Sequence, residues 1–353
     1  MEKIIISTNE NLKSEIIIEE DLRNSIQNYF EDKKYFLITN QKLAKLYPEF
    51  IYKFARERVI IIKDGEKYKN IKTFEDILSE LLKQKIERKD CIIALGGGVV
   101  GDLAGYVASS ILRGVELIQV PTTLLAMCDS SIGGKTGFNS KYGKNLIGSF
   151  YLAKKVLIDP IFLNTLNEYE YKCGLGEVVK YAFIEKSCNK NSNFNLIKFL
   201  EENQKEDVKR QMNFIIKSCA SLKAYVVAND RLEGGLRKIL NFGHTYAHPL
   251  ETLSNYKKIS HGEAVAYGMQ YASKLALIKN LIDQEYYEKI ISLIEKFELT
   301  SKKINFKKEE IIKLMAQDKK VENSKINLLL PNGFATVGLF GNIDLPSIEA
   351  SLL

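Results

Sequence analysis

The sequence has no tryptophan and only three histidines, six prolines and five cysteines among its 353 residues. The cysteines form no C-x-x-C pair, are odd in number and lie far apart, which argues against a disulfide framework and against a cysteine zinc site. No segment reaches the roughly 18 apolar residues of a membrane span, and the apolar run near the N-terminus is too short for a signal peptide. We therefore expect a cytoplasmic protein with no membrane partner.

The net charge is also small. The chain has 51 Lys and Arg residues and 44 Asp and Glu residues, which gives a net charge of +7. This small excess is spread along the chain, so it favours an anionic small-molecule substrate weakly and nucleic acid hardly at all. Hydrophobic residues make up 45% of the chain, which is enough to exclude disorder as the dominant state. The length favours two domains.

Short β-rich runs alternate with helical stretches in the first half of the chain. The runs are 35–39, 58–62, 91–95, 116–120 and 155–159, and 71–86 is an example of the helical spacing between them. This alternation predicts an α/β fold, a parallel sheet with helices on both faces, in an N-terminal domain at 1–165. From about residue 168, long amphipathic stretches dominate (196–226, 263–279, 285–297 and 308–316), with one short β element near 325–330. They predict a mostly α-helical domain at 166–353.

A glycine-rich turn follows the run at 91–95. Gly96, Gly98 and Gly101 stand in G-x-G-x-x-G register, between a strand and a helix expected over 103–110. Such glycines let the backbone approach a pyrophosphate, and the helix N-terminus offers free N–H groups to it. The fingerprint lies on a middle strand, and Glu116 begins the next strand instead of ending it. The pattern therefore indicates a nucleotide site of a variant Rossmann-like kind.

A second polar block, PTTLLAMCDSSIGGKTGFNSKYGKNLIGSF, runs from 121 to 150. Its many Gly and Ser residues suit a functional loop better than a packed core element. Thr122 and Thr123 follow a strand end, which is where open α/β sheets bind ligands.

All three histidines, His244, His248 and His261, fall in one 18-residue window. Clustered imidazoles suit a borderline cation such as zinc, which in catalytic sites usually has three protein ligands. His244 and His248 share a helical face if their segment is helical, and His261 stands at an expected helix start. Spacing alone leaves open which of them are ligands. Glu177, with Lys180 on the same helical face, is a candidate carboxylate ligand, although the pair could equally be a surface ion pair.

Taken together, these motifs resemble the 3-dehydroquinate synthases, a family of sugar phosphate cyclases. The resemblance rests on eight segments in family order: DGEKYK (64–69), GGGVVGDLAGYVAS (96–109), RGVELIQVPTTLLAMCDSSIGGKTGFN (113–139), GKNLIGSF (143–150), GEVVKYAFI (176–184), GLRKILNFGHTYAH (235–248), HGEAVAYGM (261–269) and DKK (318–320). It implies a dehydroquinate synthase-like fold, with the active site in the cleft between the two domains.

The resemblance also implies a role for each matching residue. Zinc or cobalt would be held by Glu177, His244 and His261. NAD would contact Asp64, Glu66, Lys69, Gly97, Gly98, Val99, Val100, Gly101, Asp102, Thr122, Thr123, Asp129, Lys135, Lys144, Phe162, Leu163, Asn164 and Thr165. The substrate would contact Lys135, Asn145, Lys180, Lys223, Arg237, Asn241, His248 and one of Lys319 or Lys320. Arg113 would reach the substrate phosphate of a neighbouring subunit, which implies a homodimer.

Two departures from the family pattern bear on these roles. Ala247 and Pro249 stand in the motif that the family commonly reads as G-H-T-x-G-H-A, so the helix path around His248 is in question. Asn40 stands where the family often has an aspartate near the adenosine.

The implied reaction converts 3-deoxy-D-arabino-heptulosonate 7-phosphate, an anionic sugar phosphate, into 3-dehydroquinate and phosphate in the shikimate pathway. It proceeds by NAD-assisted transient oxidation, phosphate elimination, reduction, ring opening and intramolecular aldol closure, and the enzyme is a phosphorus–oxygen lyase. The alternatives are a cyclase that forms an inosose or a valiolone, a metal-dependent polyol dehydrogenase, and a nucleotide-binding regulatory protein without activity. A substrate without a carboxylate would not need both Lys223 and Arg237.

Overall fold

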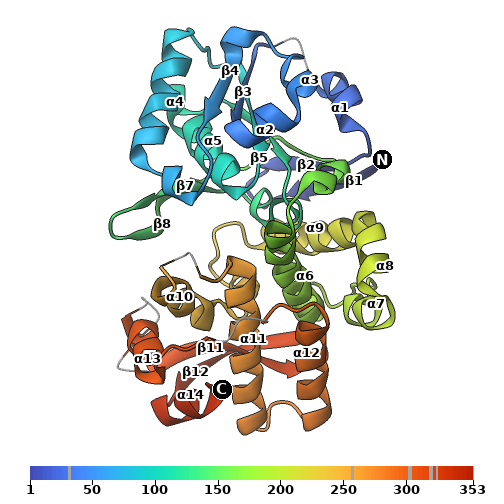
Figure 1. Cartoon of the computed structure of the whole chain (residues 1–353), viewed down its shortest axis with the longest axis vertical. Coiled ribbons are helices and arrows are strands. Elements are labelled where there is room, and N and C mark those ends of the chain that lie inside the picture. Colours follow the sequence, from blue (N-terminus) through green and yellow to red (C-terminus); the bar gives the residue numbers. More distant parts are fainter. Residues whose placement is uncertain (31–32, 256–257, 301–303, 318–320, 323–324, 353) are drawn as a thin grey trace. The chain divides into compact units, whose positions relative to one another are not determined.

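The structure, a computed structural model, describes residues 1–30, 33–255, 258–300, 304–317, 321–322 and 325–352. The chain forms two compact units (Figure 1). The first comprises Met1–Asn167 and Val227–Leu232, and the second comprises Glu168–Val226 and Glu233–Leu353. No helix of the described ranges is both long and apolar enough to cross a membrane.

The first unit is built on a seven-stranded sheet of order β1-β2-β9-β6-β5-β3-β4. Its strands are β1 (Glu2–Ser7), β2 (Lys13–Ile18), β3 (Tyr35–Asn40), β4 (Val59–Ile62), β5 (Cys91–Gly96), β6 (Glu116–Pro121) and β9 (Lys155–Ile158). Its helices are α1 (Leu22–Ser25), α2 (Gln41–Leu46), α3 (Pro48–Ile51), α4 (Ile71–Lys83) and α5 (Gly98–Ser110). Short turns of helix complete it: η1 (Ile26–Tyr29), η2 (Arg56–Arg58), η3 (Glu66–Tyr68), η4 (Ile111–Arg113), η5 (Ala126–Ser130) and η6 (Pro160–Thr165).

The predicted parallel sheet is confirmed, since all five predicted strands pair in parallel within it. β5 is buried along its whole length, which is why its sequence is a continuous apolar run without alternation. The chain first winds outward from β3 to β4 and then in the other direction from β5 through β6 to β9. The carboxyl ends of β3 and β5 therefore flank the point where an open α/β sheet binds its ligands.

Two hairpins of the first unit differ from the sequence predictions. β1 and β2 pair antiparallel and form one edge of the sheet, which the sequence did not predict. The block at 121–150, predicted as a loop, contains the antiparallel hairpin of β7 (Lys135–Ser140) and β8 (Gly143–Phe150), visible in Figure 1. Glycine is needed here for close backbone approach, because a Cβ at Gly148 would lie 2.1 Å from the backbone oxygen of Thr136.

The second unit is mostly helical, as predicted. It contains α6 (Glu168–Cys188), α7 (Leu196–Glu202), α8 (Lys205–Arg210), α9 (Met212–Asn229), η7 (Leu236–Asn241), α10 (His244–Leu253), α11 (His261–Ile278), α12 (Gln284–Lys296), α13 (Lys308–Gln317) and α14 (Leu345–Ser351). An antiparallel sheet of β10 (Val321–Glu322), β11 (Lys325–Gly333) and β12 (Thr336–Ile343) completes the unit. The amphipathic stretch at 196–226 is three helices. Asn203 and Gln204 take extended backbone angles between α7 and α8, and Gln211 leaves helical geometry between α8 and α9.

Helix α11 runs through the centre of the second unit and is buried over most of its length. It begins at His261, as the sequence predicted, and Ser260 and Glu263 form a capping box that fixes this start. α10, α6, α12, α14 and β11 all pack against α11. This central helix therefore sets the positions of the side chains that neighbouring helices bring toward His261.

Candidate metal and nucleotide sites

The glycine-rich turn of the first unit joins β5 to α5, with Gly97 as the N-cap of the helix. The backbone amide of Thr122, at the end of β6, donates to the oxygen of Gly96 at 3.1 Å. Gly101 allows α5 to lie close to β6, because a Cβ there would be 2.8 Å from the Gln119 side chain. Gln119 Nε2 in turn donates to the backbone oxygen of Gly101 at 3.0 Å. The glycine-rich turn therefore leads directly into the N-terminus of α5, and a helix N-terminus of this kind binds phosphate groups through its backbone N–H groups.

Lys69 gathers two other predicted site residues beside this turn. Its side chain is 5% exposed, and Nζ lies 2.5 Å from Asp102 Oδ2 on α5 and 2.5 Å from Asn145 Oδ1 on β8. Asn139, which the sequence analysis missed, donates to Glu66 Oε1 at 2.7 Å and accepts from the Asn145 amide at 3.0 Å. Charged and amide groups from three segments thus converge near the start of α5.

Other predicted nucleotide contacts do not join this cluster of interactions. Asp64 accepts from an amide of α2 at 3.2 Å, and Asn40 caps the same helix by accepting at 2.9 Å. Phe162 is buried and packs edge-on against Tyr47, with ring centroids 5.0 Å apart. Thr165 shares a 2.6 Å hydrogen bond with the Tyr47 hydroxyl. The side chain of Phe162 therefore belongs to the core, which leaves its backbone as the group that could face a ligand.

The remaining predicted residues of the first unit lie near the strand ends. Val99 and Val100 are in the first turn of α5, Thr123 follows β6, Asp129 is in η5, Lys135 begins β7, Lys144 is in β8, Leu163 and Asn164 are in η6, and Arg113 ends η4 as an exposed residue.

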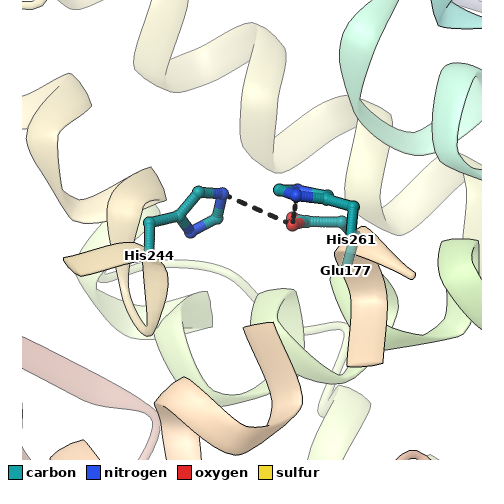
Figure 2. Close-up of side chains that lie close together, drawn as sticks. All are labelled: Glu177, His244 and His261. Carbon is teal, nitrogen blue, oxygen red and sulfur yellow. Dashed lines mark ion pairs between the residues drawn. The ribbon is translucent and has the colours of Figure 1, made fainter. Parts of the chain in front are cut away.

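The structure brings Glu177, His244 and His261 together in the second unit (Figure 2). Glu177 Oε1 lies 3.6 Å from His244 Nε2 and 3.3 Å from His261 Nε2. Three donors held by one zinc ion at about 2.0–2.2 Å in tetrahedral geometry are about 3.3–3.6 Å apart. One carboxylate and two imidazoles also form a donor set that zinc and cobalt accept. The two distances from Glu177 match this spacing, all three donor atoms lie within 4.8 Å of one another, and the donor set suits a divalent metal ion.

Glycines beside each ligand let the three helices come close enough to form this cluster. Gly176 and Gly262 meet where α6 crosses α11, and a Cβ at Gly262 would lie 2.1 Å from the Cys173 backbone oxygen. Gly243, directly before His244, contacts Gly268 of α11. A Cβ at Gly268 would lie 2.0 Å from the backbone oxygen of Gly243. Gly243 also needs its glycine backbone, with φ at +80°. Backbone-to-backbone contact thus fixes the ligands relative to one another.

The two ligand histidines differ in protonation because their surroundings differ. Burial lowers the pKa of His244 to about 3, against the opposing charge of Glu177. Burial would also lower the pKa of His261, but hydrogen bonds to Glu177 and Glu251 outweigh burial and raise this pKa to about 10. In the metal-free protein at neutral pH, His244 is therefore neutral and His261 carries a proton on each nitrogen.

Lys180 lies one helical turn after Glu177 and forms an ion pair with it. Both side chains are 1% exposed, so the interpretation of this pair as a surface ion pair is wrong. Lys180 Nζ also donates to the backbone oxygen of Leu240 at 2.7 Å. Lys223 and Arg237 are buried in the same unit. Buried cations of this kind can bind an anionic ligand through charge-assisted hydrogen bonds.

The remaining predicted residues of this unit are His248, Asn241, Lys319 and Lys320. His248 is exposed on α10, and its ring centroid lies 5.7 Å from that of His244. α10 continues through Pro249, so the substitution does not break the helix after His248. Asn241 donates to Glu233 Oε1 at 2.5 Å. Lys319 and Lys320 lie outside the described residues.

Two carboxylates in this unit escaped the sequence analysis. Glu251 Oε1 lies 3.4 Å from His261 Nδ1, and Glu233 holds Asn241 as described above. Glu251 could have been found from spacing, because it follows His244 by seven residues on the same helix and so shares its face. Glu233 carries no comparable signal.

A parallel-sheet unit with a glycine-rich turn, followed by a helical unit with a Glu–His–His cluster, defines a metal-dependent enzyme of the nucleotide-binding class. Family models agree with this class. The model described as 3-dehydroquinate synthase N-terminal matches residues 59–173, and the model described as 3-dehydroquinate synthase C-terminal matches residues 174–321. The chain belongs to the 3-dehydroquinate synthase family.

Relatives agree with this family, and a solved structure of another cyclase shares the fold. The chain is 41% identical over 320 residues to 3-dehydroquinate synthase of Thermoanaerobacter sp. strain X514, covering 88% of each chain. It is 39% identical over 349 residues to the Campylobacter fetus enzyme of the same name, covering 98% of this chain and 97% of the relative. A solved structure of 2-deoxy-scyllo-inosose synthase with carbaglucose-6-phosphate, NAD+ and Co2+ matches with a TM-score of 0.87, 26% identity and 99% coverage of both chains.

Proposed function

We propose that this chain is a 3-dehydroquinate synthase, a lyase that converts 3-deoxy-D-arabino-heptulosonate 7-phosphate into 3-dehydroquinate and phosphate. Family membership supports the reaction. The observation that carries the assignment to this chain is the Glu177–His244–His261 cluster, which has Lys180 paired with Glu177, in the same unit as the buried cations Lys223 and Arg237. A metal site in a unit with buried positive charge suits a substrate that bears hydroxyls, a carboxylate and a phosphate.

The proposed cofactors are NAD in the first unit and zinc or cobalt in the second. The glycine-rich turn and the Lys69 cluster support the nucleotide, and the donor set of the second unit supports the metal. The solved inosose synthase structure also contains NAD+ and Co2+. When bound, NAD supplies a reversible hydride acceptor and the metal supplies a Lewis acid for the substrate hydroxyls.

The chain's own residues would bind and orient the substrate. Lys223 and Arg237 are buried cations, and we assign them to the substrate carboxylate, because charge-assisted hydrogen bonds favour such donors. Lys135 and Asn145 are assigned to substrate contacts from the β7–β8 hairpin. We assign proton exchange with a substrate oxygen to His248, which is exposed one helical turn after His244.

The proposed enzyme also has an oligomeric state and a location in the cell. We propose a homodimer, because Arg113 is exposed at the end of η4 with φ at +64° and would serve a neighbouring copy. Light scattering coupled to size exclusion should give twice the 40.2 kDa mass of the chain.

A cytoplasmic location is proposed because all five cysteines are buried free thiols, as expected in a reducing compartment.

A substrate panel tests the proposed reaction against its alternatives. Purified protein with NAD and zinc is given the heptulosonate phosphate, glucose 6-phosphate or glycerol, and both phosphate release and NADH are followed. The proposal expects phosphate from the heptulosonate phosphate alone. Phosphate from glucose 6-phosphate would indicate an inosose-forming cyclase, and NADH from glycerol would indicate a polyol dehydrogenase.

Variants of the two carboxylate-binding cations sharpen this test. Lys223→Gln and Arg237→Gln should each raise KM for the heptulosonate phosphate by about tenfold or more, because a charged hydrogen bond is worth roughly 1.5–3 kcal/mol. Lys209→Gln, at an exposed position of α8, is the matched control and should leave KM unchanged. Unchanged KM in all three variants would refute the assignment of the carboxylate site.

A further inference from the structure

Glu251 is the nearest described carboxylate to the outer nitrogen of a ligand histidine. It lies on α10, two helical turns after His244, and is 6% exposed. Its Oε1 atom is 3.4 Å from His261 Nδ1, while His261 Nε2 is 3.3 Å from Glu177 Oε1. The imidazole of His261 therefore stands between two carboxylates, one facing each ring nitrogen.

We propose that Glu251 is a positioning residue, which accepts a hydrogen bond from His261 Nδ1–H and thereby directs Nε2 to the metal. The inference rests on the metal site of the proposed function. Histidines that bind metals usually donate their other ring N–H to a carboxylate or a backbone carbonyl, which fixes the tautomer and the ring orientation. Glu251 faces the nitrogen opposite to the cluster, so it acts through His261 and is not a fourth ligand.

The other ligand histidine has the equivalent arrangement with a backbone partner. His244 Nδ1 lies 3.1 Å from the oxygen of Phe242. A carbonyl oxygen can only accept, so Nδ1 carries the proton and the lone pair of His244 is on Nε2. Both rings therefore present the same atom to the metal. α10 contributes a ligand of its own, His244, and the group that orients the ligand of α11.

The experiment compares zinc affinity across variants of this carboxylate. Loss of such an outer hydrogen bond typically weakens metal binding by 10–100-fold, so Glu251→Met, which keeps the length and removes the acceptor, should weaken zinc binding by about that factor. Glu251→Gln keeps a neutral acceptor and should show a smaller loss. Affinity is measured by competition with a fluorescent chelator, and therefore does not depend on turnover.

A matched control separates this role from general damage near the site. Glu263→Gln changes a buried glutamate of α11, two residues after His261, whose carboxylate accepts from the Ser260 amide at 2.7 Å. The glutamine can still accept that bond, so zinc affinity should not change. The unfolding midpoint of each metal-free variant is recorded in parallel. If Glu251→Met does not fold, the comparison of Glu251→Gln with Glu263→Gln decides the question.

Histidine tautomers provide a readout that a merely structural role would not move. Because the chain has three histidines, labelling with 15N-histidine yields three rings in a nitrogen-detected NMR spectrum. In the zinc-loaded protein, His261 should show a protonated Nδ1 that exchanges slowly with water. In Glu251→Met, this Nδ1 proton should exchange rapidly and vanish from the spectrum.

Three outcomes decide the inference. Weaker zinc binding in Glu251→Gln together with a changed His261 signal would support it. If both Glu251 variants have the zinc affinity and the His261 spectrum of wild type, the inference is overturned. Loss of zinc in His244→Ala is the control which shows that the metal site itself is correctly assigned. Zinc retained by His244→Ala would instead overturn the metal site of the proposed function, and this inference with it.

Discussion

The crossing of α6 and α11 makes Gly262→Ala a direct probe of how the fold builds the metal cluster. A Cβ at residue 262 would lie 2.1 Å from the backbone oxygen of Cys173, and ordinary contact begins at 3.4 Å. The helices would therefore have to separate by about 1.3 Å (3.4 − 2.1). The three nearest atoms are all backbone atoms of Cys173, so no rotamer change can relieve the overlap.

Two opposing effects determine how much Gly262→Ala changes the unfolding free energy. Alanine is more favourable than glycine inside a helix by about 1 kcal/mol, whereas overpacking costs roughly 1–3 kcal/mol. Because the contact is between backbones, the upper value applies, and the net loss of unfolding free energy should be about 2 kcal/mol. Glu177 and His261 adjoin Gly176 and Gly262, and a shift of about 1 Å exceeds the tolerance of about 0.2 Å for metal ligands. Zinc affinity should fall at least tenfold.

Urea unfolding of the metal-free protein and chelator competition measure these two effects. Ser292→Ala, at an exposed position of α12, is the control for helix propensity alone and should raise the unfolding free energy by a few tenths of a kcal/mol. Our reasoning would be refuted if Gly262→Ala were as stable as wild type or more so, with zinc affinity unchanged.

Three further outcomes follow from the same cluster. His244→Ala should abolish bound metal and turnover, as measured by elemental analysis and phosphate release, and unchanged metal content would contradict the ligand assignment. Zinc binding should release about one proton from His261, because its pKa of about 10 keeps it protonated in the metal-free protein. Zinc affinity should therefore fall about tenfold per pH unit as pH is lowered from 8 to 7, and calorimetry in two buffers that shows no proton release would exclude this account. Lys180→Met should lower the unfolding free energy of the metal-free protein by about 1.5–3 kcal/mol, because it removes a charged hydrogen bond of the buried Glu177, whose other cationic neighbour is protonated His261. A loss below about 1 kcal/mol in urea unfolding would show that the pair is not needed.

The sheet of the first unit could be predicted because its strands are buried and apolar in sequence. β5 and β6 are recognisable as short apolar runs between helical stretches. β1 was missed because most of its residues are exposed or half-buried, so no core-facing pattern marks it. The β7–β8 hairpin was missed because its glycines, which serve backbone contact between the two strands, resemble those of a loop.

The membership of the metal cluster could not be predicted from residue spacing alone. His244 and His248 share a helical face, but spacing alone leaves open which histidines are ligands. In the structure His261 lies 3.3 Å from Glu177 and completes the cluster with His244. The difference is made by tertiary contacts at Gly176, Gly243 and Gly262, which no local pattern encodes. The resemblance to the family named the three residues that the structure brings together.

The central claim is that this chain releases phosphate by a reaction in which NAD is consumed and regenerated in each turnover. The most direct measurement follows phosphate and NADH together, with the heptulosonate phosphate, zinc and far less NAD than substrate. Our account predicts that all of the substrate yields phosphate and 3-dehydroquinate while no NADH accumulates. NADH that accumulates in step with substrate loss, or the absence of phosphate release from metal-loaded protein that binds NAD, would contradict it.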